Sequence, residues 1–541
     1  MKQLILFAFL LATSYTFSQS VSILEKNNVS LIAMDAGNLF QDIVNGSPGY
    51  EIPKGSGINA IYTTAFWFGA MDVGGQIHVA AQTFGGSSND FYAGPYSADT
   101  SYMDSAYMAQ YLSSIWRVTS AEIEAHNLEY AVFGSVASPS PNIMSWPAHG
   151  DPAIGVSNDL APFVDMNSDG IYDPYDGDHP EIKGCEALYI IFNDAAGPSF
   201  SSNTPIMGIE VHVMLYQYAS LDFLNDITFM DMRVVNRSPQ TLYSFASACY
   251  TDADLGGAQD DYMGCDPTRN ISYIYNGDNY DEDSNGSLGY GDAPPAIGVM
   301  YLNQYMRNAG YYVNGGPPAQ SDPNSGIKYW NYMHGKWADG QDWVYGGTGY
   351  PGSSGSTTQP SNYLFPHDPI VGASWTWTET DTDGSGSSNQ SGDRRMFMSS
   401  EQGDLLPGQE YNIDMAIVFG RDTTMTNLEN VDVMLSVADS VQAFYDAGID
   451  ECNDPFAAVP SSPSLASFGI HPNPSTGSIT IELENVDGEY DVLIQDAIGR
   501  LVYQESSSSS SLNIQINQPT GIYFVTIRTG NHYINKKLII E

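Results

Sequence analysis

Short segments in which apolar and polar residues alternate, separated by turn-forming residues, run through most of this chain. The segment FMDMRV at 229–234 is an example. Alternation with a period of two places successive side chains on opposite faces of a strand. The 52 glycines and 30 prolines supply the turns between such strands. The pattern therefore predicts a mainly β, β-sandwich-like protein rather than helices joined by ion pairs.

Two segments show helical spacing instead. Residues 119–130 (TSAEIEAHNLEY) carry a candidate N-cap at Thr119 or Ser120, and residues 427–448 have apolar residues three and four apart and end at Gly448. We expect these to be peripheral helices on a β-rich body.

The length of 541 residues is too great for one ordinary core, and 42% hydrophobic residues are enough to bury more than one. Alternating segments fill residues 21–450, where we expect two subdomains. Residues 451–466 are rich in Pro, Ser and Ala without periodicity and are typical of a linker. Residues 467–541 hold six short alternating segments, which predict a small antiparallel β-sandwich.

The N-terminus begins with one lysine, an apolar run from Leu4 to Ala12 and small polar residues near 18–20. This arrangement predicts a secretory signal peptide over residues 1–20. The rest of the sequence contains no apolar run near eighteen residues, so we expect no transmembrane span.

Export through an oxidising compartment makes the four cysteines disulfide candidates. They are Cys185, Cys249, Cys265 and Cys452. Cys249 and Cys265 are nearest in sequence and could close a small loop. The alternative is that two or more of the four remain free, buried thiols.

The formal net charge is −45, from 18 basic and 63 acidic residues. A chain with this balance repels nucleic acid and anionic membrane surfaces, since both need clustered Lys and Arg. It attracts cations.

One acidic segment has the spacing of a calcium loop. Oxygen-bearing side chains occupy positions 1, 3, 5, 9 and 12 counted from Asp165, Gly170 is at position 6, and the carbonyl of position 7 adds a backbone ligand. The predicted Ca²⁺ ligands are Asp165, Asn167, Asp169, Ile171, Asp173 and Asp176. Asp at position 12 is shorter than the usual Glu, and prolines after the loop disfavour an exiting helix. The alternative is a solvated acidic turn.

A second acidic group, Asp252, Asp254, Asp260, Asp261 and Asp266, could share an ion, although its spacing fits no single-loop template. The sequence contains no HExxH, GxSxG, phosphate-binding glycine loop or CxxC motif. Glu210 and His212 fall on one face of a predicted strand, where a buried structural contact is the commoner explanation. The catalytic residues are therefore unknown from sequence.

The C-terminal segments HPNPSTG (471–477), VLIQDAIGRLVYQ (492–504) and PTGIYFVTIRTG followed by KKLIIE (519–541) resemble the type A sorting domain of the type IX secretion system. That resemblance implies a Bacteroidota-type bacterium and export across the outer membrane. It also implies that residues 467–541 are recognised by the secretion machinery and removed by a sortase-like peptidase. The remaining cargo would then be attached to the cell surface or released.

Residues 21–450 resemble large uncharacterised surface proteins with the same domain, in segments such as PKGSGINAIY, SWPAHGDP and APPAIGV. This resemblance implies no known activity. We expect a calcium-stabilised secreted surface protein with a structural, adhesive or binding role toward an extracellular polymer or surface ligand. The alternative is a secreted hydrolase acting on extracellular glycan or protein.

Overall fold

The structure, a computed structural model, describes residues 20–43, 45–84, 89–111, 114–284, 286–370, 377–381, 389–450, 452, 468–483, 490–496, 500–529 and 532–541. The chain divides into two compact units, Met1–Asp454 and Pro455–Glu541. We call the first the cargo unit. The predicted signal peptide 1–20 and linker 451–466 lie outside the described residues, apart from Ser20 and Cys452.

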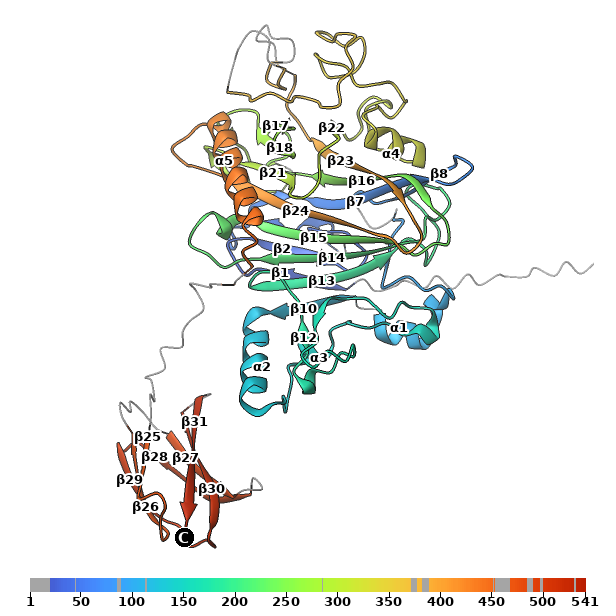
Figure 1. Ribbon diagram of the computed structural model, residues 1–541. Coiled ribbons are helices and arrows are strands. Elements are labelled where there is room, and N and C mark those ends of the chain that lie inside the picture. The colour runs from blue at the N-terminus through green and yellow to red at the C-terminus, as the bar shows by residue number, and fades with distance from the viewer. Residues whose placement is uncertain are drawn as a thin grey trace, which may run out of the picture. The chain divides into compact units, whose positions relative to one another are not determined.

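Two large antiparallel sheets stacked face to face form the centre of the cargo unit (Figure 1). The larger sheet follows the order β10 (Ile115–Thr119), β13 (Glu186–Asn193), β14 (Ile209–Gln217), β15 (Thr228–Asn236), β24 (Glu410–Gly420), β21 (Ala296–Tyr301), β18 (Ile271–Asn276) and β17 (Asp261–Asp266), with β9 (Tyr92–Ala93) beside β13. The smaller sheet follows the order β22 (Asn308–Tyr312), β23 (Arg395–Leu405), β16 (Leu242–Asp252), β7 (Thr63–Met71) and β8 (Ile77–Ala81). Val213 of β14 and Phe245 of β16 belong to the apolar cluster that both sheets bury between them.

The alternation predicted for 229–234 is confirmed in β15. Met230, Met232 and Val234 face the apolar cluster between the sheets. Asp231 and Arg233 face the other side of the larger sheet, where they line a cleft. The period of two thus separates the core of the protein from a polar surface.

Two layers cover the outer side of the larger sheet. Helix α5 (Asn427–Asp446) packs Val431, Met434 and Ala438 over β24, β21 and β18. Gly420 of β24 permits this close approach, because a Cβ there would lie 2.4 Å from the Met434 backbone. The second layer lies over β10 and β13 and consists of residues 101–111 and 120–183. Its elements are η1 (Ser101–Met103), α1 (Ser105–Tyr111), α2 (Ser120–Phe133), α3 (Pro141–Met144), η2 (Pro152–Ile154), β11 (Phe163–Val164), η3 (Pro174–Asp176) and β12 (His179–Pro180).

Both helices predicted from sequence are confirmed. α2 begins after a capping box in which the Thr119 hydroxyl accepts from the Glu122 N–H, and α5 has the same box at Thr426 and Glu429. α4 (Gly326–Met333) was not predicted; it packs against β7, β8, β16 and β23 of the smaller sheet.

Aromatic rings fill the space between α4 and the smaller sheet. Trp67 of β7 stacks on Tyr250 of β16 with ring centroids 5.5 Å apart, and Tyr250 in turn stacks on Tyr312 of β22 at 5.9 Å. Tyr332 of α4 closes the stack on Tyr312 at 5.7 Å. These large buried rings make this a rigid layer.

Shorter elements complete the cargo unit. They are β1 (Val21–Leu24), β2 (Ser30–Met34), β3 (Gln41–Asp42), β4 (Ser47–Pro48), β5 (Tyr50–Glu51), β6 (Asn59–Ile61), η4 (Phe223–Asp226), β19 (Tyr280–Asp281) and β20 (Gly291–Asp292). Strands β1, β2, β5 and β6 form one sheet, while β3 pairs with β4, β11 with β12 and β19 with β20.

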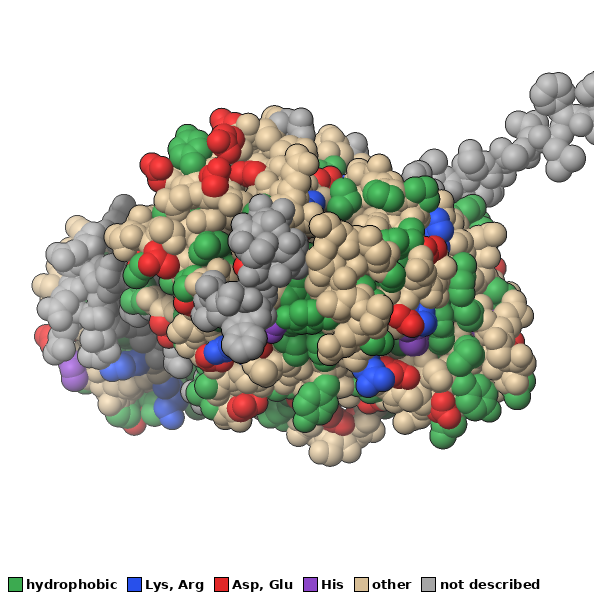
Figure 2. All heavy atoms as spheres, turned by 90° about the horizontal axis from the view of Figure 1, so that it is seen from above, with side chains coloured by type: hydrophobic (Ala, Val, Ile, Leu, Met, Phe, Trp, Pro, Cys, Tyr) green, Lys and Arg blue, Asp and Glu red, His purple; other side chains and the backbone are tan. Residues whose placement is uncertain are grey.

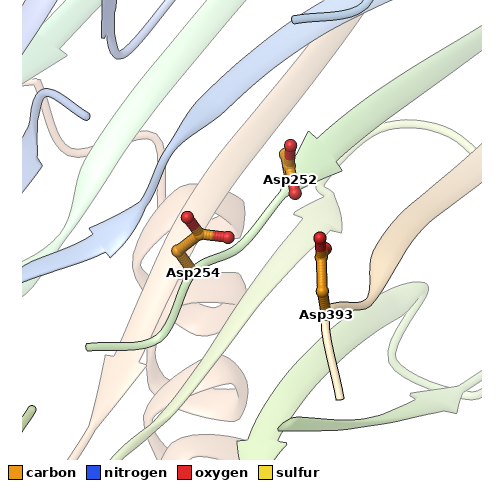
Figure 3. A group of neighbouring side chains, drawn as sticks. All are labelled: Asp252, Asp254 and Asp393. Carbon is orange, nitrogen blue, oxygen red and sulfur yellow. The ribbon is translucent and has the colours of Figure 1, made fainter. Parts of the chain in front are cut away.

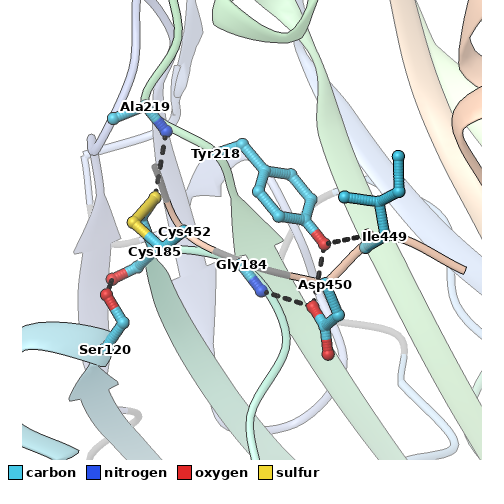
Figure 4. Close-up of a disulfide and its surroundings, with 8 residues drawn as sticks. All are labelled: Ser120, Gly184, Cys185, Tyr218, Ala219, Ile449, Asp450 and Cys452. Atoms are coloured by element: carbon cyan, nitrogen blue, oxygen red, sulfur yellow. Dashed lines mark hydrogen bonds between the residues drawn. A yellow bond between two sulfur atoms is a disulfide. The ribbon is translucent and has the colours of Figure 1, made fainter. Parts of the chain in front are cut away.

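A disulfide joins Cys185, immediately before β13, to Cys452, which follows α5 (Figure 4). Cys249 and Cys265 are free and buried. A Cys249–Cys265 bridge is therefore wrong, and the alternative of free buried thiols holds for this pair. The physical reason is that Cys249 lies in β16 of the smaller sheet and Cys265 in β17 of the larger one.

The C-terminal unit is a small antiparallel β-sandwich. One sheet has the order β25 (Phe468–His471), β26 (Ser478–Leu483) and β29 (Ser511–Gln515), and the other β28 (Leu501–Ser507), β27 (Tyr490–Asp496), β30 (Gly521–Thr529) and β31 (His532–Ile540). The core between the two sheets includes Ile481 of β26 and Val525 of β30, both fully buried. The prediction of a mainly β, multidomain chain is confirmed; the division of 21–450 into two subdomains stays a prediction.

No helix among the described residues is long and apolar enough to cross a membrane. On the nearer face of the molecule seen in Figure 2, Lys and Arg side chains are scattered among acidic, apolar and uncharged groups.

Candidate functional sites

A polar cleft of about 640 Å³ opens on the outer side of the larger sheet, beside residues 148–183 of the layer that covers β10 and β13. Its floor is built from side chains that lie opposite one another on neighbouring strands. One row across β13, β14, β15 and β24 is Tyr189, Met214, Asp231 and Asp414. The adjacent row is Ile191, His212, Arg233 and Asn412. Except for Ile191, all of these residues line the cleft.

A hydrogen-bonded chain runs through the floor of the cleft. The Glu210 Oε1 atom lies 2.9 Å from His212 Nε2, and His212 Nδ1 lies 2.9 Å from the Tyr189 hydroxyl. Arg237 Nη2 donates to the same Glu210 oxygen at 2.6 Å. Burial opposes the negative charge of Glu210, but His212 and Arg237 hold its pKa at about 2. Burial lowers the pKa of His212 to about 4. Near neutral pH the pair is thus a carboxylate and a neutral imidazole.

Two carboxyl groups face each other in the row that begins with Tyr189. Asp231 and Asp414 are directly opposite in the β15–β24 register, where cross-strand neighbours are about 5 Å apart at Cα. Lys183 Nζ donates to Asp231 Oδ2 at 2.7 Å, and the Tyr445 hydroxyl of α5 donates to Asp414 Oδ2. Burial, followed by the charge of Asp231, raises the pKa of Asp414. The pair therefore combines a lysine-bound carboxylate with a carboxyl group that binds a proton more readily.

The predicted calcium loop curls around its first residue. Asp165 Oδ1 accepts from the Ser168 N–H at 2.6 Å, and Asp165 Oδ2 accepts from the Gly170 N–H at 2.7 Å. Gly170 has φ +78°, as the sharp turn at position 6 requires. Asp169 Oδ1 accepts from the N–H of Ile171 at 2.8 Å.

The second half of the predicted loop is arranged differently. Asp173 caps η3 by accepting from the Tyr175 N–H, and Asp176 lies inside η3. The carboxylates of Asp165, Asp169, Asp173 and Asp176 supply no group of three ligand atoms within 4.8 Å of one another. The donor chemistry fits Ca²⁺, because carboxylate, amide and backbone oxygens are the ligands that this ion prefers.

Asp178 is a residue of this loop that the sequence reasoning missed. It is fully buried, and its two oxygens accept from the N–H groups of Met166 and Asp173 at 2.8 and 2.9 Å. The carboxylate therefore ties the beginning of the loop to its later half. Its signal in the sequence is an acid two positions beyond the twelve-residue template.

The base of the loop is also a wall of the cleft. Strand β11 before the loop pairs with β12 after it, with Phe163 opposite Pro180. Phe163 and Glu181 line the cleft. His149 supports the same loop, because its Nε2 accepts from the Tyr172 N–H at 3.1 Å. A change in the conformation of the loop would therefore change the shape of the cleft.

A separate acidic cluster lies at the end of β16. Asp252, Asp254 and Asp393 turn their carboxylates toward one another (Figure 3), and one ligand oxygen from each falls within 4.8 Å of the others. Burial raises the pKa of Asp252 to about 7, and it also raises the pKa of Asp254 and of Asp393. The sequence grouped Asp252 with Asp254, but Asp393 is far away in the chain and was not expected.

The other acids of the predicted second site lie elsewhere. Asp260 accepts from the Asn276 amide at 2.9 Å, and Asp261 accepts from the Leu255 N–H at 3.3 Å. Asp266, at the other end of β17, forms an ion pair of 2.6 Å with Arg269. The predicted group of five is therefore divided among several places.

Residues 469–541 match the family of secretion system C-terminal sorting domains. The C-terminal unit is a type IX secretion sorting domain. The protein is accordingly exported by the type IX secretion system to the cell surface, and its sorting domain interacts with the secretion machinery.

One curated relative, the ulvan lyase NLR42 of Nonlabens ulvanivorans, is 33% identical over 83 residues, which are 15% of this chain and 15% of that enzyme. Two solved structures resemble the chain weakly. A polysaccharide lyase aligns over 86% of this chain and 44% of its own at 8% identity and a TM-score of 0.18. PorZ, a surface component of the type IX secretion system of Porphyromonas gingivalis, aligns over 71% and 48% at 12% identity and a TM-score of 0.14.

Proposed function

We propose that the protein is a calcium-stabilised, surface-displayed binding protein whose cleft holds a hydroxyl-rich extracellular polymer such as a glycan. The observation that carries the proposal is the cleft floor itself. It presents a guanidinium, an amide, two carboxyl groups and an imidazole in two rows on a rigid sheet, with Phe163 and Tyr189 beside them. Such a mixture of donors and acceptors with aromatic faces suits polar sugar units.

Calcium enters this proposal through the loop 165–176. The proposed ligands are Asp165, Asn167, Asp169, Ile171, Asp173 and Asp176, and the ion would stabilise the loop whose base forms a wall of the cleft. Stabilisation by an ion bound only to the folded state follows from mass action. A sortase-like peptidase that removes residues 467–541 is the proposed partner of the C-terminal unit.

The second candidate is a secreted hydrolase acting on extracellular glycan or protein. The facing Asp231 and Asp414 favour it, since a carboxylate beside a carboxyl group of raised pKa is an arrangement used in acid–base catalysis. The similarity to an ulvan lyase also favours an enzyme that acts on glycan, but it covers only 15% of each chain.

The test is binding of the purified full chain to a panel of extracellular polysaccharides, with released reducing ends measured in parallel. Retained polymer without new reducing ends supports binding, and new ends support hydrolysis. Arg233→Gln should weaken binding about tenfold, because it removes a charge-assisted donor from the floor. Arg307→Gln is the matched control, since Arg307 lies outside the residues that line the cleft and is 62% exposed. Equal binding by both variants would contradict the proposal.

A further inference from the structure

The cluster of Asp252, Asp254 and Asp393 carries more negative charge than its surroundings compensate. Arg395 lies opposite Asp252 in the β16–β23 register and donates through Nε to Asp252 Oδ2 at 2.9 Å. Its other nitrogens lie 3.4 Å from Asp393 and 3.3 Å from Asp322. One guanidinium therefore serves three carboxylates, and Asp254 adds a fourth.

Two buried oxygens of the cluster have no hydrogen-bond partner among the described residues. They are Asp252 Oδ1 and Asp393 Oδ1. Asp252 is only 2% exposed, so water cannot solvate this oxygen freely. A buried, unpaired carboxylate oxygen destabilises the folded state unless a cation or a donor completes its surroundings. The cluster therefore lacks a cation or a hydrogen-bond donor at the position toward which its carboxylates are turned.

The donor set indicates which kind of ion completes it. Every candidate ligand is a carboxylate oxygen, and hard oxygen donors favour Ca²⁺ or Mg²⁺ over softer transition metals. Oxygens that share one Ca²⁺ at about 2.3–2.6 Å are at most about 5 Å apart. The three ligand atoms, all within 4.8 Å of one another, meet this limit.

We propose that Asp252, Asp254 and Asp393 bind one Ca²⁺ ion, in addition to any ion held by the loop 165–176. The ion would join the end of β16 to the segment before β23, beside the stacked rings of Tyr250 and Tyr312. The proposal does not depend on the cleft, whose floor belongs to the other large sheet.

The experiment is a calorimetric Ca²⁺ titration of the chelator-treated full chain, in the wild type and in Asp169→Ala, which removes a ligand of the loop. Adding Asp254→Asn with Asp393→Asn should lower the number of bound Ca²⁺ ions by one on both backgrounds. Asp342→Asn with Asp439→Asn is the matched control, because both side chains are mostly exposed and lie outside the two acidic sites. An unchanged number of ions in the Asp254→Asn, Asp393→Asn variants would overturn the proposal.

Thermal melting in EDTA distinguishes a Ca²⁺ site from a cluster of acids that only share protons. Asn relieves repulsion without changing shape, so the double variant should melt at or above the wild-type temperature in EDTA and gain less from added Ca²⁺. An equal gain from Ca²⁺ in both proteins would contradict the proposal. If the double variant does not fold, Asp254→Asn alone must weaken Ca²⁺ binding at least tenfold, and unchanged affinity would overturn the proposal. Tighter binding of Mg²⁺ than of Ca²⁺ at this site would overturn the assignment of the ion.

Discussion

Cys185 and Cys452 are bonded to each other across 267 residues of sequence, and this bond ties the end of the cargo unit to the start of β13 (Figure 4). Asp450 reinforces the attachment, because its Oδ1 accepts from the Gly184 N–H at 3.1 Å and from the Tyr218 hydroxyl at 2.9 Å. The segment after α5 is therefore fixed to the larger sheet before the sorting domain begins. Cleavage of the chain after Cys452 would remove the sorting domain and leave the disulfide of the cargo unit intact.

Thiol counting gives the first prediction. In the native protein without reductant, thiol reagents should label neither Cys249 nor Cys265. Both side chains are buried, and burial raises the pKa of Cys249 to about 12. Denaturation without reductant should expose two thiols, and denaturation with reductant four. Mass spectrometry after alkylation measures each state. Labelling of Cys185 or Cys452 in the unreduced, denatured protein would contradict the pairing.

Removal of the disulfide gives the second prediction. Cys185→Ser with Cys452→Ser should lower the free energy of unfolding by about 2–5 kcal/mol, because the bond restricts a long loop in the unfolded chain. Thermal melting of the full chain checks this. Reductant should lower the melting temperature of the wild type but not that of the double variant. Equal melting of the two proteins without reductant would disprove a stabilising role.

Calcium gives the third prediction. Chelation should lower the melting temperature of the cargo unit, since an ion at 100 times its Kd stabilises the folded state by about 2.7 kcal/mol. Asp169→Ala should abolish the part of the Ca²⁺ response that belongs to the loop. Asp439→Asn, an exposed acid outside both acidic sites, is the control. Identical Ca²⁺ responses of Asp169→Ala and the wild type would rule out the loop as a calcium site.

The sorting domain gives the fourth prediction. A chain truncated before residue 467 should remain inside the cell envelope, because it lacks the domain that the secretion machinery recognises. Protease accessibility of intact cells, with a periplasmic marker as control, measures display. Normal surface display of the truncated chain would show that export does not need this domain.

Local patterns predicted local structure well. Alternation located β15. A candidate cap at Thr119 or Ser120 located α2, and apolar residues three and four apart located α5. The strands of the C-terminal unit were also located, with the exception of β25. Each of these features depends on neighbours a few residues apart, which sequence periodicity records directly.

The sites depend on contacts between distant segments, and no local pattern records these. Asp393 meets Asp252 only because β23 pairs with β16, and the cleft floor exists only because β13, β14, β15 and β24 are neighbours in one sheet. Cys452 finds Cys185 for the same kind of reason, while the closer pair of cysteines in sequence is separated between two sheets. In all three cases the missing information was which segments, distant in sequence, lie side by side in the fold.

Acid sensitivity gives the fifth prediction, and it concerns His212. Because the pKa of His212 falls from 6.5 to about 4 on burial, the unfolded chain binds a proton between these pH values that the folded chain does not. The free energy of unfolding should therefore decrease as pH falls from 6.5 to 4, by about 3 kcal/mol from this group at about 1.4 kcal/mol per pH unit. Glu210 adds to the loss below its ordinary pKa, since its folded pKa is lowered to about 2.

His212→Gln isolates this contribution, because glutamine can donate to Glu210 and accept from Tyr189 without titrating. The buried acids with raised pKa, such as Asp252 and Asp281, act in the opposite direction but are the same in both proteins. Melting temperatures between pH 4.5 and 7 should thus fall less steeply for His212→Gln than for the wild type. His78→Gln, which changes a histidine on β8 of the other sheet, is the control for the loss of one histidine. Parallel curves for the wild type and His212→Gln would mean that this imidazole titrates at its ordinary pKa in the folded protein.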